Sequence, residues 1–349
     1  MKLNVSQPAR RKSANLRCLW VHNFDPAIPV GGVFMHTLAD AMHECGIRVD
    51  LLYTGKLSNP MEIWRARNLL REIEGGFDIV HAQYGSMCCL VASAARGRKL
   101  ISLRGSDWYN VPVGPWLQRL HGALANLLTR MGLPYYDRVV VMSQNMRSEI
   151  QKKHSFQNHR IDVLPDGLDL ELFQPMNRAA CRQALGCGDD KRPWVLLTTL
   201  FEDNPIKRVP LAREALALAR LQMPDIIFKV ASDVAHRDMP LWINACNVTL
   251  MTSIHEGWPN AIKESLACNV PFVSTDVSDL GLISAVEPSC KTVAAEPAAL
   301  ANALVDTLQH PVSSNLRSYV KDMEVNVVAR QLRHIYYEMM DTPCADSAQ

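Results

Sequence analysis

The sequence lacks three features, each of which is typical of a particular class of proteins. Its 37 Lys and Arg residues nearly balance its 35 Asp and Glu residues, and the formal net charge of +2 gives no bulk attraction for nucleic acid or an anionic membrane. No segment approaches the roughly 18 consecutive apolar residues of a membrane span. No GxGxxG pattern is seen, which counts against a nicotinamide-dependent oxidoreductase. Any anion that this protein binds must therefore be bound locally.

The ten cysteines form no CxxC pair and no other spacing typical of metal ligands. Several lie in apolar segments such as residues 80–94, and we interpret them as buried thiols in a reducing compartment. The N-terminal segment is basic but has no apolar stretch of the kind that secretory signals carry. These features predict a cytoplasmic protein.

A chain of 349 residues with 48% hydrophobic residues predicts about two globular domains. Short apolar runs rich in β-branched residues alternate with segments of helical period. In the first half, strands are expected near residues 16–22, 47–53, 77–82, 99–103 and 138–143, and helices near 32–45, 60–74, 85–95 and 114–131. Because parallel neighbours need a crossover connection, this alternation predicts a doubly wound parallel α/β sheet.

The alternation begins again after a charged linker near residues 172–192. Strands are expected near residues 194–200, 226–231, 247–253 and 271–276, and helices near 208–221, 239–245, 260–269 and 296–309. The stretch from Ser313 to about Met340 has helical character. We therefore expect domains at 1–172 and 173–325, with a C-terminal helix at 326–349 that crosses back to the first domain.

Ligands of doubly wound sheets bind beyond the carboxyl ends of the strands, so the loops after strands are the candidates for a site. Gly31 and Gly32 lie between the first expected strand and an amphipathic helix. Paired glycines at a helix N-terminus let backbone N–H groups approach an anion. A tight turn that requires positive φ explains them equally well.

A second loop places two carboxylates around the start of a helix. Glu256 precedes Gly257 in the loop, Asn260 is expected as the N-cap, and Glu264 lies about one turn into the helix. A carboxylate there can accept two hydrogen bonds from a cis-diol such as a ribose, while the N-terminal amides of the helix face a phosphate.

The full string around these residues resembles the donor-binding signature of the retaining family-4 glycosyltransferases of the GT-B fold. The positions that match are Glu256, Gly257, Pro259, Glu264, Ala267, Pro271 and Val273. Segments along nearly the whole chain are similar to that family in order and spacing, among them FDIVHAQYG, ISLRGSDW and IDVLPDGLDLELFQP. The chain departs from the family pattern at Arg104, Asp166 and Asn247, and it lacks the arginine that usually precedes the lysine in the loop ending at Lys207.

The resemblance implies two Rossmann-like domains that face each other across a cleft, the second holding a nucleotide sugar and the first its acceptor. It implies that Glu264 holds the ribose hydroxyls and that Glu256 faces hydroxyls of the donor sugar. The same loop carries Gly257 and Pro259. The remaining implied donor contacts come from Asn260, from the amides of Ala261 and Ile262 near the diphosphate, and from the N–H of Gly32 in the opposite domain.

Two further loops carry candidate residues. Lys207 and Arg208 can stabilise the negative charge that grows on a departing diphosphate, although alone they are equally typical of a solvated helix start. Arg104 and Asp107 are expected to touch phosphate and acceptor hydroxyls, respectively. His81 lies at a strand end, where it is either part of the site or a buried structural histidine.

The function implied is a metal-independent, retaining hexosyl transfer from a nucleotide-diphosphate sugar to a hydroxyl of a glycan or lipid-linked acceptor, in cell-surface polysaccharide synthesis. No cofactor is expected, and no Ser/His/Asp arrangement, metal-ligand cluster or DxD pair in a suitable loop is evident. We interpret Asp189 and Asp190 as exposed linker charges. Two alternatives stay open: a non-catalytic GT-B-like partner subunit, which the departures from the pattern favour, and a GT-B epimerase of nucleotide sugars.

A segment near 114–132 combines apolar and basic residues with helical spacing. We interpret it first as a core-packing helix, and the alternative is a basic amphipathic helix that rests on the inner face of a membrane, where lipid-linked acceptors lie. The residues concerned are Trp116, Leu117, Leu120, Leu124, Leu127 and Leu128, with Arg119, His121 and Arg130.

Overall fold

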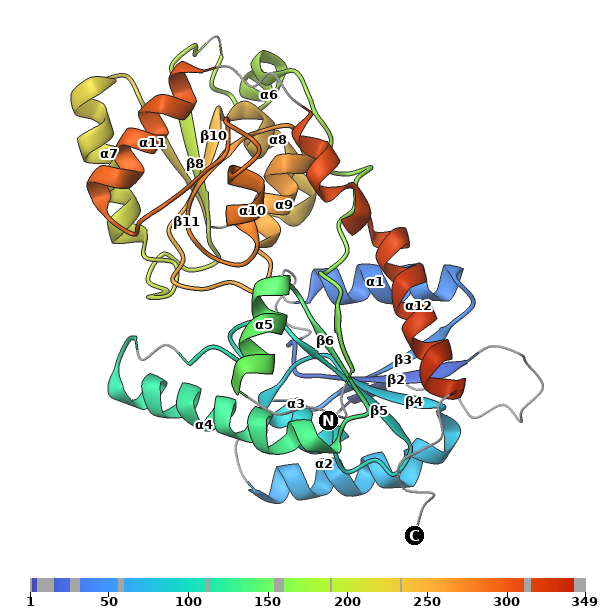
Figure 1. Ribbon diagram of the computed structural model, residues 1–349. Helices are drawn as coiled ribbons and strands as arrows, with labels where there is room; N and C mark the ends of the chain where they lie inside the picture. The colour runs from blue at the N-terminus through green and yellow to red at the C-terminus, as the bar shows by residue number, and fades with distance from the viewer. Residues whose placement is uncertain are drawn as a thin grey trace. The chain divides into compact units, whose positions relative to one another are not determined.

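The computed structural model describes residues 2–4, 16–25, 32–55, 60–110, 113–153, 160–188, 190–232, 234–310 and 315–341. The chain divides into two compact units, Met1–Gly167 with Val325–Gln349, and Leu168–Glu324 (Figure 1). The last helix of the chain therefore belongs to the first unit. Within the described ranges, no helix is long and apolar enough to cross a membrane.

The first unit is built on a sheet with the strand order β1-β3-β2-β4-β5-β6-β7. Its pairs are parallel except for the edge pair of β1 with β3, which is antiparallel. The strands are β1 (Lys2–Asn4), β2 (Arg17–His22), β3 (Arg48–Tyr53), β4 (Ile79–Ala82), β5 (Arg98–Leu103), β6 (Arg138–Val141) and β7 (Arg160–Val163). The helices are α1 (Val33–Glu44), α2 (Pro60–Ile73), α3 (Ser86–Ala92), α4 (Trp116–Gly132), α5 (Gln144–Lys153) and α12 (Val325–Asp341), with 3₁₀ turns η1 (Glu74–Gly76) and η2 (Leu133–Tyr135).

The strands of this sheet alternate their side chains between two packed faces. One face carries residues such as Leu19, Val80 and Ile101 and forms a hydrophobic core with α2, α3 and α5. On the other side of the sheet, α12 packs along α1 (Figure 1). Both faces of the central strands are buried, which explains why these strands are nearly continuous apolar runs in the sequence.

A buried chain of polar side chains fastens α12 to the sheet. Trp20 in β2 donates its indole N–H to the hydroxyl of Tyr336 in α12 at 2.8 Å. The same hydroxyl lies 2.7 Å from Nδ1 of His81 in β4, and Nε2 of His81 lies 2.8 Å from Oγ of Ser102 in β5. Because the hydroxyl accepts from Trp20, its own proton is available to Nδ1, and Nε2 then donates to Ser102. Every member is satisfied while His81 is neutral, and burial lowers the pKa of His81 well below its ordinary value.

The second unit holds a parallel sheet with the strand order β12-β11-β10-β8-β9. Strands β8, β10 and β11 form a core with α7 and α11 on one face, while α8 and α9 pack together. The strands are β8 (Trp194–Thr198), β9 (Ile227–Ala231), β10 (Val248–Met251), β11 (Phe272–Thr275) and β12 (Lys291–Val293). The helices are α6 (Arg178–Ala184), α7 (Val209–Gln222), α8 (Met239–Ala245), α9 (Asn260–Ala267), α10 (Leu280–Ser284) and α11 (Pro297–Gln309), with 3₁₀ segments η3 (His236–Asp238) and η4 (Leu316–Met323).

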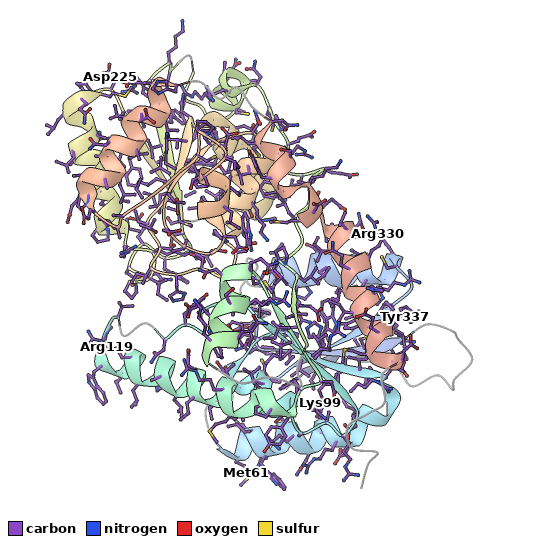
Figure 2. All side chains as sticks on the ribbon, in the orientation of Figure 1. Met61, Lys99, Arg119, Asp225, Arg330 and Tyr337 are labelled. Carbon is purple, nitrogen blue, oxygen red and sulfur yellow. The ribbon has the colours of Figure 1, made fainter. Side chains whose placement is uncertain are left out.

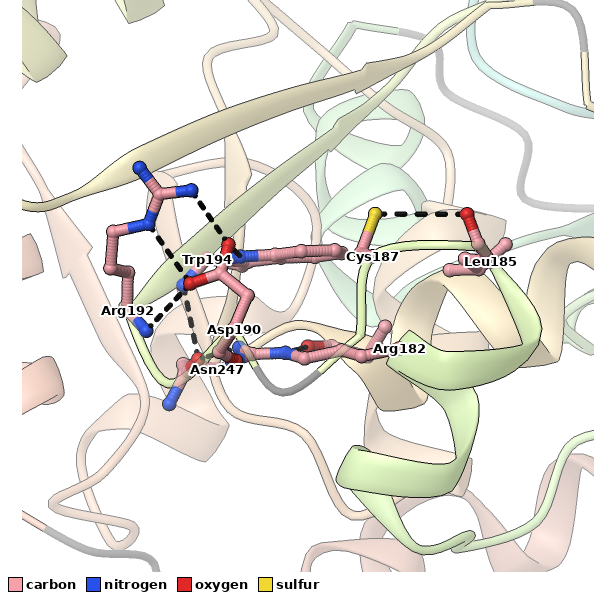
Figure 3. Close-up of polar contacts among 8 residues, drawn as sticks. Arg182, Leu185, Cys187, Asp190, Arg192, Trp194 and Asn247 are labelled. Atoms are coloured by element: carbon pink, nitrogen blue, oxygen red, sulfur yellow. Dashed lines mark hydrogen bonds and ion pairs between the residues drawn. The ribbon is translucent and has the colours of Figure 1, made fainter.

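A polar network closes the amino end of β8 (Figure 3). Oδ1 of Asn247 accepts hydrogen bonds from the Trp194 amide and from the Arg182 guanidinium. Asp190 accepts from Arg192 and from the Trp194 indole. Asp190 is therefore not the exposed linker charge that we predicted, and Asp189 lies outside the described residues. This end of the sheet is opposite the carboxyl ends of the strands. Asn247, which departs from the family pattern, therefore has a structural role here.

The sequence-based prediction of the elements differs from the structure mainly at short or interrupted segments. All nine predicted strands are present, but β1, β7 and β12, of three, four and three residues, were missed. The helix predicted from Ser313 to Met340 is divided: η4 ends at Met323, and α12 begins at Val325 in the other unit. Seven of the nine described cysteines are buried, as their apolar surroundings predict.

We predict that the first unit loses stability as the pH falls below about 6.5, the ordinary pKa of histidine. The pKa of His81 is lowered by burial, and burial lowers that of His22 to about 4. The unfolded chain therefore binds more protons than the folded chain in this range, which costs up to about 1.4 kcal/mol per group and pH unit. Urea unfolding at several pH values should show a shallower loss for His81→Gln than for the wild type. The matched control His43→Gln, at an exposed site in α1, should keep the wild-type slope; equal slopes for all three proteins would contradict the account.

Candidate functional site

The carboxyl ends of β8 and β10 form the topological switch point of the second sheet. From β8 the chain passes through α7 to β9 on one side, whereas β10 lies on the other side and continues through α9 to β11. Loops that diverge in this way leave a crevice where ligands of doubly wound sheets bind. A small pocket lies here, lined among others by Thr198, Lys207, Thr252, Ser253 and Ala261.

The loop after β8 brings Lys207 to Glu256, which comes from the loop after β10. Nζ of Lys207 lies 2.6 Å from Oε1 of Glu256, and both side chains are partly exposed. Two of the candidate residues that we predicted from separate loops therefore meet at the switch point. A partly exposed ion pair of this kind adds little to stability, because water that reaches it screens the attraction. Its groups remain available to a ligand that offers both an anion and hydroxyl groups.

Arg208 holds these two loops together. It adopts a left-handed conformation (φ +48°) at the start of α7, and its guanidinium donates to the carbonyls of Thr252 at 2.6 Å and Ser253 at 2.9 Å. The Thr252 hydroxyl donates back to the Lys207 carbonyl at 2.6 Å. We predicted that Arg208 shares the phosphate contact of Lys207. The structure shows its N–H groups directed to backbone carbonyls, so we assign it a positioning role.

The N-cap of helix α9 lies one residue earlier than we predicted. The N-cap is Pro259, with φ −71° and ψ 116°, and Asn260 is the first helical residue, with an exposed side chain. The Ile262 amide already donates to the Pro259 carbonyl at 3.1 Å. The amides of Asn260 and Ala261 are thus better placed than that of Ile262 to meet an anion. Gly257 is fixed through its carbonyl, which accepts from the Ser278 hydroxyl.

Glu264 is 8% exposed and faces His236, which precedes α8. The Glu264 Oε1 lies 3.4 Å from Nε2 of His236, and the His236 ring is 5.2 Å from that of Phe173. The hydrogen bond to Glu264 raises the pKa of His236. We did not predict His236 as a site residue, because it lies in a polar loop without a motif.

In the first unit, Gly32 is required by its geometry. It caps α1 with φ +79°, and a Cβ atom there would lie 2.9 Å from Cβ of Phe24. Positive φ and the close approach of Phe24 both favour glycine. The tight-turn interpretation of Gly32 is therefore confirmed, which leaves its anion contact a prediction. Gly31 lies outside the described residues.

Arg104 and Asp166 form an ion pair with each other. Arg104 also donates to the backbone carbonyl and the side-chain oxygen of Gln83, and its guanidinium lies over the Phe34 ring. Burial lowers the pKa of Arg104 to about 10. Both residues depart from the family pattern, and the structure shows that the two departures belong to one interaction.

Asp107 and His81 are structural rather than ligand-facing. The Asp107 side chain is fully buried and accepts hydrogen bonds from the amides of Gly85, Arg104 and Gly105. Burial raises the pKa of Asp107, while these amide bonds oppose the rise. The expectation that it touches acceptor hydroxyls is therefore wrong. His81 is 1% exposed and engaged at both ring nitrogens, which decides between the two interpretations left open for it.

Two family profiles match this chain. The profile described as Glycosyltransferase Family 4 matches residues 37–172, and the profile described as Glycosyl transferases group 1 matches residues 208–310. Together they cover more than half of the chain, and the second includes the loop after β10 and helix α9. The chain belongs to glycosyltransferase family 4.

Curated relatives of this family-4 chain include D-inositol 3-phosphate glycosyltransferase of Mycobacterium tuberculosis strain H37Rv, with 24% identity over 170 residues. The matched stretch covers 41% of this chain and 35% of the length of that relative.

Solved structures of similar fold cover almost the whole chain. Sucrose-phosphate synthase from Thermosynechococcus elongatus superposes with a TM-score of 0.73 at 17% identity, over 94% of this chain and 100% of that chain. HepE from Anabaena, solved with UDP and glucose, superposes with a TM-score of 0.64 at 17% identity, over 93% and 100%. The family-4 chain has the GT-B fold.

We predict that Arg104 and Asp166 are energetically coupled. Replacing Arg104 by Met removes the charge that faces Asp166 in a largely buried setting, and it should lower the free energy of unfolding by roughly 3 kcal/mol. Asp166→Asn should also destabilise. The double variant Arg104→Met, Asp166→Asn should cost less than the sum of its two single substitutions, because it leaves no unpaired charge at this position. Urea unfolding of the four proteins measures the coupling, and additive effects would refute the pairing.

Proposed function

We propose that this family-4 protein transfers a hexosyl group from a nucleotide-diphosphate sugar to a hydroxyl group, with retention of the anomeric configuration and without a metal ion. The observation that supports this proposal is the ion pair of Lys207 with Glu256 in front of α9. Glu264 lies about one turn into the same helix. This arrangement offers a cation, two carboxylates and a helix N-terminus at one switch point.

Each group matches one part of such a donor. The Glu264 carboxylate would accept hydrogen bonds from the two ribose hydroxyls, in place of the contact with His236. The amides of Asn260 and Ala261 would donate to the diphosphate, where the helix dipole also favours negative charge.

Donor binding would break the ion pair of Lys207 with Glu256. Phosphate oxygens would accept from the Lys207 ammonium, and sugar hydroxyls would donate to the Glu256 carboxylate. Because both side chains are partly exposed, exchanging one partner for another costs little. Lys207 would then stabilise the charge that develops on the diphosphate as the bond to the sugar breaks.

A retaining transfer of this kind needs no basic side chain. The acceptor oxygen forms its bond to C1 on the face from which the diphosphate leaves, and a departing phosphate oxygen takes the hydroxyl proton. Within the described residues, no group of three or more His, Cys, Asp or Glu side chains is placed to hold a metal ion. Metal independence is our proposal from the positions of Lys207 and the α9 amides, which supply the positive charge themselves.

We propose that the acceptor is a hydroxyl of a glycan or of a lipid-linked sugar. The reaction would take place in the cytoplasm and contribute to the synthesis of cell-surface polysaccharide. A lipopolysaccharide outer core galactosyltransferase is among the structures of similar fold, with a TM-score of 0.63, which is compatible with this class of acceptor. The non-catalytic alternative rested on departures from the family pattern. Arg104, Asp166 and Asn247 now have structural partners, so only the missing arginine in the loop before Lys207 still favours it.

We predict that Glu264→Ala weakens binding of the donor nucleotide about tenfold or more, because charge-assisted hydrogen bonds to the ribose are lost. A thermal-shift screen of UDP, GDP and their sugar conjugates identifies the nucleotide, and calorimetry on the hit compares the variants. Glu264→Gln keeps the side-chain volume and tests the same charge if the alanine variant folds poorly. Glu214→Ala, at an exposed position in α7, is the control and should bind like the wild type.

Unchanged donor affinity in both Glu264 variants would reject the assignment of this site. Binding without transfer, combined with formation of an epimerised nucleotide sugar, would favour the epimerase alternative. Absence of binding to every nucleotide in the screen would favour the non-catalytic alternative.

A further inference from the structure

Helix α4 of the first unit has one face packed and one face open. On the packed face, Thr129 accepts a hydrogen bond from the Ser86 amide, and Gly132 lies against Cys89 of α3. Asn126 is also buried and donates to the carbonyl of Ser106, in the loop after β5. The helix is therefore fixed to the unit along this side.

The open face carries a continuous row of large apolar side chains, which we call the apolar stripe. Its exposed fractions run from 45% to 70%, and it comprises Trp116, Leu117, Leu120, Leu124, Leu127 and Met131. At about 100° per residue, these positions fall within an arc of about 100° on the helix surface. The core-packing interpretation of this segment is therefore wrong for five of the six apolar residues on which it rested; only Leu128 is half-buried.

Basic residues border the apolar stripe, and α4 contains no acidic residue. By the same helical spacing, Arg119 and Arg130 fall along one edge, and His121 lies along the other. Arg130 is half-buried, with its guanidinium over the Trp108 ring. Arg119 is exposed near the N-terminal end of the helix (Figure 2). Tyr135, which is 64% exposed, lies in η2 just after the C-terminal end of the helix.

We propose that the apolar stripe docks on an anionic lipid surface, with α4 parallel to the plane of the membrane. A helix with exposed leucines, basic edges and no acidic residue combines apolar burial with attraction to anionic headgroups. Tryptophan and tyrosine at the two ends suit the boundary between acyl chains and water.

The same charges disfavour a second copy of the chain as the occupant of this face. Two antiparallel α4 helices that met through their apolar stripes would bring Arg119 of one copy towards Arg130 of the other. Neither helix supplies an acidic side chain to neutralise them. A bilayer with anionic lipids suits both the apolar stripe and the exposed Arg119.

Vesicle sedimentation tests this proposal without any donor or acceptor, so its outcome is independent of the proposed reaction. The full chain is mixed with phosphatidylcholine vesicles, with or without about one-third phosphatidylglycerol. We expect binding to the anionic vesicles, weakened by salt. The double variant Leu120→Asp, Leu127→Asp should bind about tenfold more weakly or worse, because two leucines no longer enter the bilayer. The exposed positions of both leucines leave the core intact.

Three further variants make the test specific. Leu221→Asp, at a leucine in α7 that is 80% exposed, is the matched control and should bind like the wild type. Arg119→Gln should lower the preference for anionic over neutral vesicles. The emission of Trp116 should shift to the blue on binding, a change that Trp116→Phe removes.

Three results would overturn the proposal. The first is no sedimentation with either kind of vesicle, and the second is equal binding by the double variant and the wild type. The third is a concentration-dependent dimer, detected by analytical ultracentrifugation, that the double variant abolishes; this would assign the face to a second copy of the chain.

Discussion

The site in the second unit depends on the hydrogen bonds from the Arg208 guanidinium to the carbonyls of Thr252 and Ser253. These bonds join the loop after β8 to the loop after β10 at the point where the two chain directions diverge. A parallel sheet brings the carboxyl ends of its strands to one edge, but it does not by itself fix the loops beyond them. With the loops joined, Lys207 and Glu256 come to 2.6 Å from each other. Arg208, through its bonds to backbone carbonyls, thus determines where the charges of the site lie.

The first unit uses buried polar groups for a comparable purpose. Asp107 receives three backbone amides and fixes the turn that follows β5, and Arg104 in the same turn reaches Gln83 and Asp166. Asn126, on the packed face of α4, ties this helix to the same turn, so the apolar stripe and the turn belong to one fixed part of the unit. If the acceptor is lipid-linked, membrane contact and acceptor entry would then occur on the same unit.

The sequence predicts the sheets well because their strands are buried on both faces, and β-branched runs such as RVVV at β6 have few alternatives. It predicts Glu256, Glu264 and Lys207 because a strand, a glycine or proline and a helix start lie at fixed spacing around them. It fails for Asp107 and leaves His81 undecided, since the sequence around a polar residue beside a strand is the same whether the side chain faces a ligand or other protein groups. Pairs such as Arg104 with Asp166 are 62 residues apart and appear only after folding. Whether the leucines of α4 are exposed depends on which helices pack nearby. Helical spacing predicts an apolar face but not whether another element covers it.

The most direct test of the proposed reaction is the anomeric configuration of the product. The donor identified by nucleotide screening is incubated with the protein and a hydroxyl acceptor, and the anomeric proton is followed by ¹H NMR from the first minutes of reaction. The account predicts that a new glycosidic bond forms with the same anomeric configuration as the donor. Formation of the opposite anomer, or the absence of any transferred sugar from a donor that binds through Glu264, would contradict it.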